Sequence, residues 1–331
     1  MVKFVLTRIG SMIVVLLVLA FVILCLQRYT PADPVRAKLG ANASKESVAR
    51  ERHRLGYDKP LPVQYLNYVR GLLHGDMQDS LRTRHPVLDD LRAYLPATLE
   101  LALFSLVLAI VMGMSLGLAA AARARGSGLL RIVLVAGASA PTFLVALIGL
   151  LVFYRRLGWL PSTGRTSFYD APDGPTGLLT IDSLLAGRLD VFWDVLQHLV
   201  MPGFCVAIGP AVAIGRTLRG SVVATLRTDY VRTARSKGLR ERTVLLKHAV
   251  RNSMGPALSM TGLQVGLMFA GVVVVESIFA WPGLGLYTVQ SIPRLDFPAI
   301  AGVTLLLGAL YVVVNAVVDV VQAIVDPRLT L

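Results

Sequence analysis

The sequence is poor in charged residues. Asp, Glu, Lys and Arg make up only 16% of its 331 residues, whereas a soluble domain usually contains about 25%. Hydrophobic residues account for 55% of the chain, and the mean hydropathy is +0.65. The apolar residues also gather in separate blocks that are long enough to cross about 30 Å of hydrocarbon as helices. This composition excludes an ordinary soluble protein and indicates a polytopic membrane protein.

Cysteine and the spacings typical of metal ligands are equally scarce. The two cysteines, Cys25 and Cys205, lie within apolar blocks and are interpreted as small hydrophobic side chains rather than a disulfide pair. The five histidines show no H-x-x-x-H spacing, and there is no C-x-x-C pair to complete a zinc site. We therefore expect this chain to bind no metal.

The sequence also lacks a nucleotide-binding loop. The nearest pattern runs from Gly215 to Ser221 and has the G-x-x-x-x-G spacing, but serine stands where the phosphate-binding lysine is required. We expect no cofactor on this chain and no enzymatic activity of its own. A membrane enzyme is an alternative class, with no motif to support it.

Basic residues are in excess, 33 against 20 acidic ones, which gives a formal charge of +13. A nucleic-acid-binding protein gathers such charge on one soluble face, whereas a membrane protein gathers it in short cytoplasmic loops. The excess here lies in residues 1–8, 123–131 and 219–256, between the apolar blocks. We therefore expect lipid and no nucleic acid as a partner, and we place these three segments in the cytoplasm.

Six apolar blocks predict six transmembrane helices. They cover Ile9–Leu26, Ala97–Ala122, Ile132–Tyr154, Leu199–Leu218, Ala257–Ala280 and Ala299–Val325. The first block exceeds the roughly 7–15 apolar residues of a signal peptide, and no small-x-small cleavage site follows it. An even number of spans places both termini on the same side, and the basic short segments identify that side as the cytoplasm. The predicted fold class is an all-α polytopic membrane protein.

We divide the chain into three predicted parts. Residues 1–27 form the N-terminus and the first transmembrane helix, residues 28–95 a small outer domain, and residues 96–331 a five-helix core that includes the cytoplasmic segment 219–256. In the outer domain one amphipathic helix is predicted to end at Gly75-Asp76, from the helical spacing of Val63, Leu66, Val69 and Leu73. This helix is either a solvated or interfacial cap or a landing surface for an outer partner.

Small residues, prolines and polar residues within the spans are candidates for packing or function. The G-x-x-x-G pairs at Gly113 and Gly262 predict close helix approach, and the prolines of the third and fourth spans predict kinks. Charges in hydrocarbon are costly, so Glu100 and Glu276 are either solvated at the outer rim or functional. The candidates for the pathway or for contacts between subunits are Glu100, Pro141, Gln264, Glu276, Asn315, Asp319 and Gln322.

The last three of these candidates belong to one polar stripe. Together with Asp326 they follow i, i+4, i+7 and i+11, so the four residues share one face of the sixth span. We expect this face to meet a partner subunit or the basic inner segment, where Arg216 is a candidate partner for Asp319.

The inner segment from Asp229 to Pro256 carries the most specific pattern. An apolar edge of Tyr230, Val231 and Ala234 ends at Gly238, a natural helix C-cap, and a second amphipathic run starts at Val244 and ends before Pro256. The pattern predicts a helix, a glycine elbow and a second helix in the cytosol. The composition alone also fits a basic segment lying on anionic lipid.

At this segment the sequence resembles the cytoplasmic loop of binding-protein-dependent ABC importer permeases, specifically the B-type inner-membrane subunit of the dipeptide/oligopeptide group. The general permease loop begins Glu-Ala-Ala, and here Arg232, Thr233 and Ala234 hold those places while the glycine is kept. The likeness covers nearly the whole chain and rests further on Thr30–Pro34, Leu55–Tyr65, Gly75–Arg82, Leu95–Leu101, Phe279–Gly285 and Asp326–Leu329.

The resemblance implies a permease subunit of the bacterial cytoplasmic membrane that forms half of a translocation pathway for peptides. Its implied partners are a second homologous permease, an extracytoplasmic substrate-binding protein and two ABC ATPase subunits, which would hold the ATP and Mg²⁺. The implied ATPase-coupling residues are Tyr230, Arg232, Thr233, Ala234, Lys237, Gly238, Leu239 and Glu241.

Two alternatives stay open at this point. An ion-gradient-driven secondary transporter of a small solute is the competing class, although such carriers often show internal repeats and midplane ion sites, and no convincing repeat relates residues 1–165 to 166–331. The cargo is also undecided, since relatives of the resembled group carry dipeptides, oligopeptides, glutathione or nickel.

Overall fold

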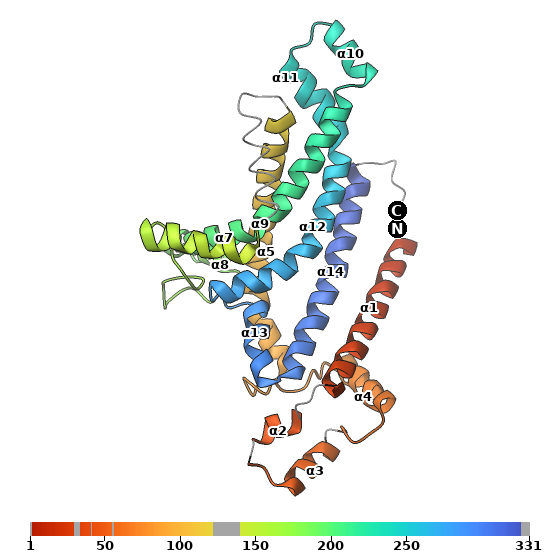
Figure 1. The fold of residues 1–331 in the computed structure, drawn as a ribbon, viewed down its shortest axis with the longest axis vertical. Helices are drawn as coiled ribbons and strands as arrows, with labels where there is room; N and C mark the ends of the chain where they lie inside the picture. Colours follow the sequence, from red (N-terminus) through yellow and green to blue (C-terminus); the bar gives the residue numbers. More distant parts are fainter. Residues whose placement is uncertain (1, 30–33, 41, 55, 122–139, 326–331) are drawn as a thin grey trace. The chain divides into compact units, whose positions relative to one another are not determined.

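The computed structural model describes residues 2–29, 34–40, 42–54, 56–121 and 140–325 (Figure 1). Over these residues the secondary structure is helical, apart from one isolated β-bridge between Asp79 and Pro86. The chain divides into two compact units: Met1–Thr98 with Pro282–Val312 (unit 1), and Leu99–Trp281 with Val313–Leu331 (unit 2). The prediction of an all-helical membrane protein is confirmed at this level.

Five described stretches are long and apolar enough to cross a membrane, namely Leu6–Tyr29, Val87–Ala121, Leu189–Thr225, Glu241–Ile278 and Phe297–Val321. They correspond to the first, second, fourth, fifth and sixth predicted spans. The predicted third span begins at Ile132, outside the described residues. Its described end consists of α7 (Thr142–Gly149) and the π-helical η1 (Leu150–Arg156). Pro141 is the N-cap of α7, so a helix begins there, as a fixed proline φ allows.

Unit 1 contains α1 (Val2–Tyr29) and the first parts of α5 (Val87–Ala121) and α14 (Phe297–Val325). It also contains the short helices α13 (Leu284–Ser291) and η3 (Ile292–Arg294). One core cluster joins α5, α13 and α14 through Val87, Leu91, Leu284, Tyr287, Ala299 and Val303. The close approach of α14 to α5 requires Gly302, because a Cβ at that position would lie 2.5 Å from Cγ1 of Val87.

The predicted outer segment contains α2 (Pro34–Leu39), α3 (Lys45–Arg54) and α4 (Leu61–Leu73). The helix expected before Gly75 is present as α4, and none of its side chains is fully buried. Leu66 is 66% exposed and Leu73 81% exposed, whereas Tyr65, Tyr68 and Leu72 pack against α1 and α14. The tyrosines bury large rings and keep a polar end, as in the bond from the Tyr65 hydroxyl to the Leu17 carbonyl at 3.1 Å.

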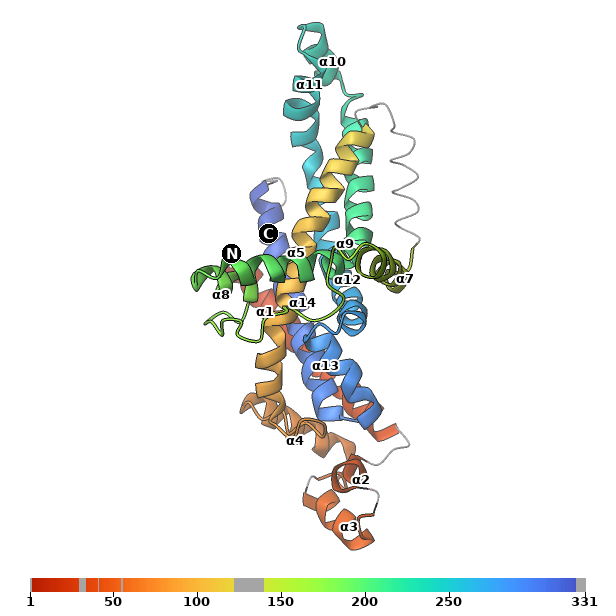
Figure 2. The ribbon, with the colours of Figure 1, turned by 90° about the vertical axis from the view of Figure 1, so that its left-hand side faces the viewer.

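Unit 2 is held together by close helix packing around α9 (Leu189–Thr225). Cβ atoms added at Gly113 and Gly117 of α5 would lie 2.7 Å from the carbonyl oxygens of Ala211 and Gly215 of α9, and Figure 2 shows the two helices side by side. The predicted packing of this G-x-x-x-G pair is confirmed. The same stretch has G-x-S-x-G spacing, but Ser115 lies within a helix and not on the strand-to-helix turn of a hydrolase.

The helix that follows the elbow does not end before Pro256, contrary to the prediction. The short α11 (Glu241–Thr243), the π-helical η2 (Val244–Val250) and α12 (Arg251–Ile278) follow one another without a break, and Pro256 lies inside α12. A proline removes one backbone hydrogen bond from a helix, and the helix can continue where neighbouring helices satisfy the carbonyl that is left free. In the same way, α9 continues through Pro202 and Pro210.

Candidate functional site

The predicted helix–glycine–helix pattern is present at residues 229–243, which we call the elbow. Its first helix, α10 (Asp229–Ser236), begins after Thr228, and Asp229 places a negative charge in the first turn. The helix ends at Lys237, and Gly238 follows with a φ of +75°. This left-handed conformation is the one that favours glycine, because a Cβ would approach the following carbonyl oxygen.

The elbow is held by a small apolar core and a side-chain clamp. Val231 and Val244 are fully buried and pack with Ala234 and Leu226. The Arg235 guanidinium donates to both carboxylate oxygens of Glu241 across the turn, at 2.7 and 3.2 Å. Arg235 was not among the predicted coupling residues. The opposite charges six residues apart on either side of Gly238 could have indicated this contact.

The predicted coupling residues divide between the core and the surface of the elbow. Ala234 is buried, and Tyr230 is 44% exposed with its hydroxyl accepting from the Asn252 side-chain amide at 3.0 Å. The remaining predicted residues, Arg232, Thr233, Lys237, Gly238, Leu239 and Glu241, are exposed. The elbow therefore presents a fixed, largely basic surface with apolar positions in it, and the role of these residues in coupling stays a prediction.

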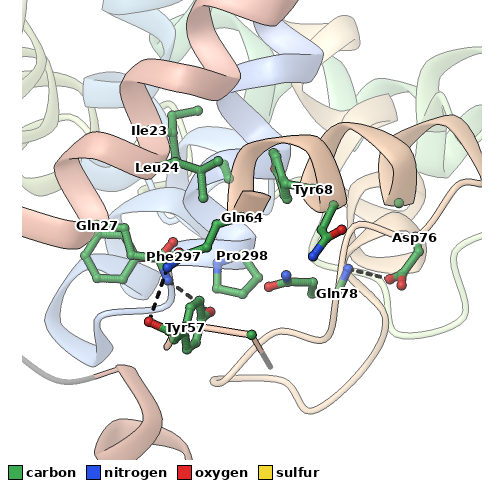
Figure 3. Close-up of a pocket in the computed structure, with 14 residues that line it drawn as sticks. Ile23, Leu24, Gln27, Tyr57, Gln64, Tyr68, Asp76, Gln78, Phe297 and Pro298 are labelled. Atoms are coloured by element: carbon green, nitrogen blue, oxygen red, sulfur yellow. Dashed lines mark hydrogen bonds between the residues drawn. The ribbon is translucent and has the colours of Figure 1, made fainter. Parts of the chain in front are cut away.

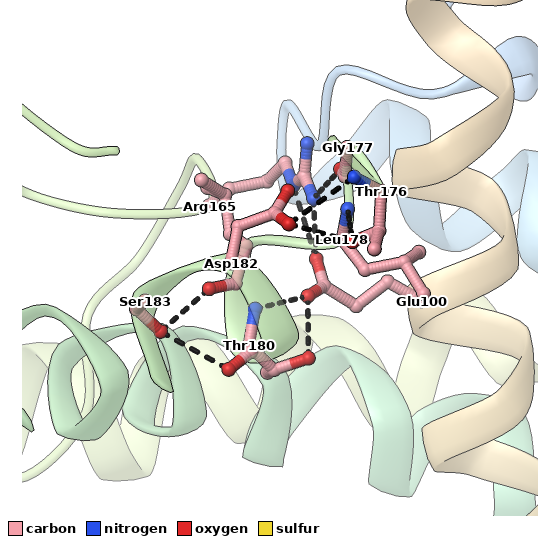
Figure 4. A network of polar contacts seen from close by, with 9 residues as sticks. Glu100, Arg165, Thr176, Gly177, Leu178, Thr180, Asp182 and Ser183 are labelled. Carbon is pink, nitrogen blue, oxygen red and sulfur yellow. Dashed lines mark hydrogen bonds and ion pairs between the residues drawn. The ribbon is translucent and has the colours of Figure 1, made fainter. Parts of the chain in front are cut away.

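Glu100 lies at the centre of a buried polar network in unit 2 (Figure 4). Its carboxylate is nearly inaccessible and accepts a hydrogen bond from the Arg165 guanidinium at 2.6 Å. The second carboxylate oxygen accepts from the backbone N–H and the hydroxyl of Thr180, at 2.7 and 2.8 Å. Glu100 is thus paired and enclosed, where the sequence also allowed a solvated position at the outer rim.

The network fastens the long connection between η1 and α9 to α5. Arg165 also donates to the carbonyl of Gly177 at 3.1 Å, and its guanidinium lies over the ring of the buried Trp281 at 5.8 Å. Asp182, in α8 (Leu179–Leu185), accepts from the backbone N–H and hydroxyl of Thr176 at 3.2 and 2.8 Å. Sequence reasoning found Glu100 but missed these partners, because they lie 65 or more residues away in the chain.

Glu276 lies in the last turn of α12, and Trp281 follows the end of that helix. Both side chains are fully buried, so Glu276 is not the water-exposed residue that one reading of the sequence allowed. The backbone N–H of Trp281 donates to the Glu276 carbonyl at 2.9 Å, and the Gly164 N–H donates to the Phe279 carbonyl at 2.9 Å. The turn at the end of α12 is therefore tied to the connection that also carries Arg165.

The other predicted pathway residues are placed on helices without being brought to one point. Gln264 lies in α12, where its amide contacts the Met260 sulfur at 3.6 Å. Asn315 and Asp319 are partly buried on one side of α14, as their spacing predicts. The side chain of Gln322 and the whole of Asp326 lie outside the described residues. Arg216 is exposed, and its pairing with Asp319 stays a prediction.

A second polar cluster, in unit 1, was not identified from the sequence. The fully buried Asp296 follows Leu295, whose φ is +54°. It accepts from the Ser80 hydroxyl at 2.5 Å and from the Arg82 backbone N–H at 3.0 Å. Nearby, the Tyr287 hydroxyl donates to Asp90 at 2.8 Å. Ser80 and Arg82 belong to Gly75–Arg82, one of the motifs that carry the family resemblance. That motif was the feature of the sequence that could have pointed to this cluster.

Neither network has the composition of a metal site. Among the described residues, no group of three or more His, Cys, Asp or Glu side chains is arranged to hold a metal ion. The geometry instead serves to join segments that are distant in sequence, and the exposed elbow is the feature suited to contact another protein.

Comparison with known proteins places the chain in a family. The model for "Binding-protein-dependent transport system inner membrane component" matches residues 109–331, and the corresponding N-terminal model matches residues 1–102. The dipeptide transport system permease protein DppB of Alkalihalophilus pseudofirmus is 34% identical over 99% of both chains. The di/tripeptide transport system permease protein DppB of Pseudomonas aeruginosa is 38% identical over 99% of both chains.

A third relative is the probable D,D-dipeptide transport system permease protein DdpB of Escherichia coli, which is 39% identical over 90% of this chain and 89% of its own length. These matches confirm the resemblance that the motifs indicate. With its apolar helices, the chain is a multi-pass protein of the inner membrane. It belongs to the family of inner membrane components of binding-protein-dependent transport systems, as a permease subunit.

Proposed function

We propose that this chain forms half of the translocation pathway of an ATP-driven importer whose cargo is di- or oligopeptides. A homologous second permease supplies the other half, and an extracytoplasmic binding protein delivers the peptide. Two ATPase subunits hold the ATP and Mg²⁺. Peptide cargo is supported by the names of the similar permeases, which are dipeptide and di/tripeptide transport proteins.

The exposed, internally braced elbow is the observation that carries the proposal. Uphill transport needs a source of free energy, and a nucleotide can shift the equilibrium between inward-facing and outward-facing states only by its different affinity for those states. Because the ATP is held on another subunit, that difference must reach this chain through a contact. The Val231–Val244 core and the Arg235–Glu241 clamp support a docking surface that moves as one piece with α9 and α12.

The proposal includes the finer topology. Six spans, with both termini and the elbow in the cytoplasm and residues 28–95 outside, are supported by the placement of basic residues and by the five described spans. The third span is proposed from its apolar sequence alone. Under this topology the Glu100–Arg165 network holds an outer connection and the Asn315–Asp319 stripe approaches the inner side.

Purification tests the proposal. The tagged full-length chain is extracted from its native membrane in mild detergent, and the co-eluting proteins are identified by mass spectrometry. The expected result is one homologous permease and ABC ATPases. Reconstituted into liposomes with the binding protein outside and ATP inside, the complex should accumulate a labelled dipeptide. Accumulation by the isolated chain from a proton or sodium gradient, without ATPases, would instead identify an ion-driven carrier and refute the proposal.

A further inference from the structure

A polar pocket lies within unit 1, between α1, α4 and the start of α14. It is partly open to solvent and has a volume of about 110 Å³, whereas a single water needs roughly 10–15 Å³ on this measure. One wall is formed by Ile23, Leu24 and Ala301, and Figure 3 shows Tyr57, Gln27 and Phe297 on one side with Asp76 and Gln78 on the other. The space is therefore larger than a single buried water requires.

The lining of this pocket has an unusual chemical composition. Three aromatic rings, Tyr57, Tyr68 and Phe297, line it together with four side-chain amides, those of Gln27, Gln64, Asn67 and Gln78. Asp76 is the one lining residue that carries a full charge. Aromatic rings and a single carboxylate that line the same pocket can together bind an ammonium group, through cation–π and ionic attraction.

Several of the polar groups are available to a ligand. Gln27 and Gln64 are occupied in bracing the wall, since their amide nitrogens donate to the Tyr57 hydroxyl at 3.0 Å and to the Lys59 carbonyl at 2.8 Å. The side chains of Asn67, Tyr68 and Gln78 have no hydrogen-bond partner among the described residues. Burial raises the pKa of Tyr68 to about 12, so its hydroxyl keeps its proton at neutral pH.

The carboxylate is held in place by its own turn. One Asp76 oxygen accepts from the backbone N–H of Gln78 at 2.8 Å, and the backbone N–H of Asp76 donates to the Gly71 carbonyl at 2.9 Å. The second carboxylate oxygen is left for another donor. Asp76 is exposed, and its turn holds the carboxylate in one position, which lowers the ordering cost of binding.

We propose that this pocket binds a small ammonium group at the membrane surface. The ammonium can come from the headgroup of a zwitterionic phospholipid such as phosphatidylethanolamine or from a free amine of similar size. The pocket lies at the ends of two candidate spans, α1 and α14, where headgroups are found, and the buried side chains of Ile23 and Leu24 form an apolar wall within it. The net negative charge of the lining disfavours anionic headgroups such as phosphatidylglycerol.

The test uses the full-length chain and a matched pair of variants. Asp76→Asn removes the charge but keeps an oxygen to accept the Gln78 N–H, so the turn is retained. Asp79→Asn makes the same change at an exposed residue outside the pocket. Native mass spectrometry counts the lipids retained from an equimolar mixture of phosphatidylethanolamine and phosphatidylglycerol. A parallel titration with ethanolamine, read as thermal stabilisation in detergent, tests the free amine.

The wild-type protein should retain phosphatidylethanolamine in preference to phosphatidylglycerol, and Asp76→Asn should lower that preference about five-fold, as for one partly exposed ion pair. Asp79→Asn should leave it unchanged. Asp76-dependent stabilisation by ethanolamine would identify a free amine as a sufficient ligand, and retention of the lipid without it would assign the site to the headgroup. The proposal fails if neither phosphatidylethanolamine nor ethanolamine binds in a manner that depends on Asp76.

As a second variant, Tyr68→Phe removes only one hydroxyl from the pocket and is not expected to disturb the fold. It should weaken retention of the same lipid about two- to three-fold, because one hydrogen bond is lost. Unchanged retention in both Asp76→Asn and Tyr68→Phe, with normal elution of both variants as folded protein, would place any bound lipid elsewhere.

Discussion

Gly238 provides the most direct test of the elbow. Its φ is +75°, and a Cβ built there meets no atom within 4 Å, so a side chain is opposed by the backbone conformation and not by its surroundings. For a β-branched residue this conformation costs at least about 1–2 kcal/mol relative to glycine. A cost of about 2 kcal/mol changes a conformational equilibrium roughly 30-fold, which is enough to displace the elbow from its braced geometry.

The Gly238→Val variant is measured in the reconstituted complex under the proposed function. ATP hydrolysis and uptake of a labelled dipeptide are followed in the same proteoliposomes, and their ratio reports coupling. We expect uptake to fall at least ten-fold while basal ATP hydrolysis persists, because the ATPases keep their own sites but the contact no longer moves this chain. Gly238→Asn should retain most of the uptake, since asparagine adopts the left-handed conformation more readily than other residues.

Gly187→Val is the matched control, because Gly187 also has a positive φ, +69°, and open space around it, but lies before α9 and outside the elbow. It should carry a similar backbone penalty and leave the coupling ratio unchanged. A normal ratio of uptake to ATP hydrolysis in Gly238→Val would refute the role of the elbow. An equal loss of coupling in Gly187→Val would also refute it, because the effect would then come from general destabilisation.

Three further substitutions test the interior of the helical core. Glu100→Gln should lower stability by about 3 kcal/mol, because it leaves the buried Arg165 charge without its partner; thermal unfolding in detergent and proteolysis of the connection that carries Arg165 measure the loss. Gly117→Val should separate α5 from α9 at a cost of about 1–3 kcal/mol, because its Cβ would lie 2.7 Å from the Gly215 carbonyl oxygen. Thermal unfolding in detergent measures this loss as well. Asp319→Leu should impair assembly with the partner permease or uptake, as judged by co-purification and transport.

The first two of these substitutions have controls in the same chain. Asp89→Asn removes an exposed ion pair with Arg92 at 3.5 Å and should change stability by less than about 1 kcal/mol. Gly209→Ala adds a Cβ that meets nothing within 4 Å, so α9 should keep its packing. If Glu100→Gln unfolds like Asp89→Asn, the network is not structural. If Asp319→Leu assembles and transports normally, the polar stripe faces water at the inner mouth.

Elements whose causes are local could be predicted from the sequence. Apolar length predicted the five described spans, because hydrocarbon thickness sets the number of residues that a crossing helix needs. The glycine at 238 fixed the elbow, since the positive φ that it supplies depends on that residue alone. The four-residue spacing of Gly113 and Gly117 predicted a closely packed helix face, because residues at that spacing lie on the same side of a helix.

Features that depend on partners distant in the chain could not be predicted without the folded structure. The spacing in α4 predicted an amphipathic helix, but it did not indicate that Tyr65 and Tyr68 pack, partly buried, against α1 and α14, because that contact depends on helices distant in the chain. Pro256 was predicted to follow a helix end, yet α12 continues on both sides of it.

Glu100 shows the same division most clearly. Its position in an apolar block marked it as a costly residue, but its enclosure depends on Arg165 and Thr180, which are brought to it by a connection 65 to 80 residues further along. Local sequence fixes helix length, turn conformation and helix faces, because those depend on neighbouring dihedral angles. Burial and charge pairing depend on which distant segments meet, and that is decided by packing of the whole chain.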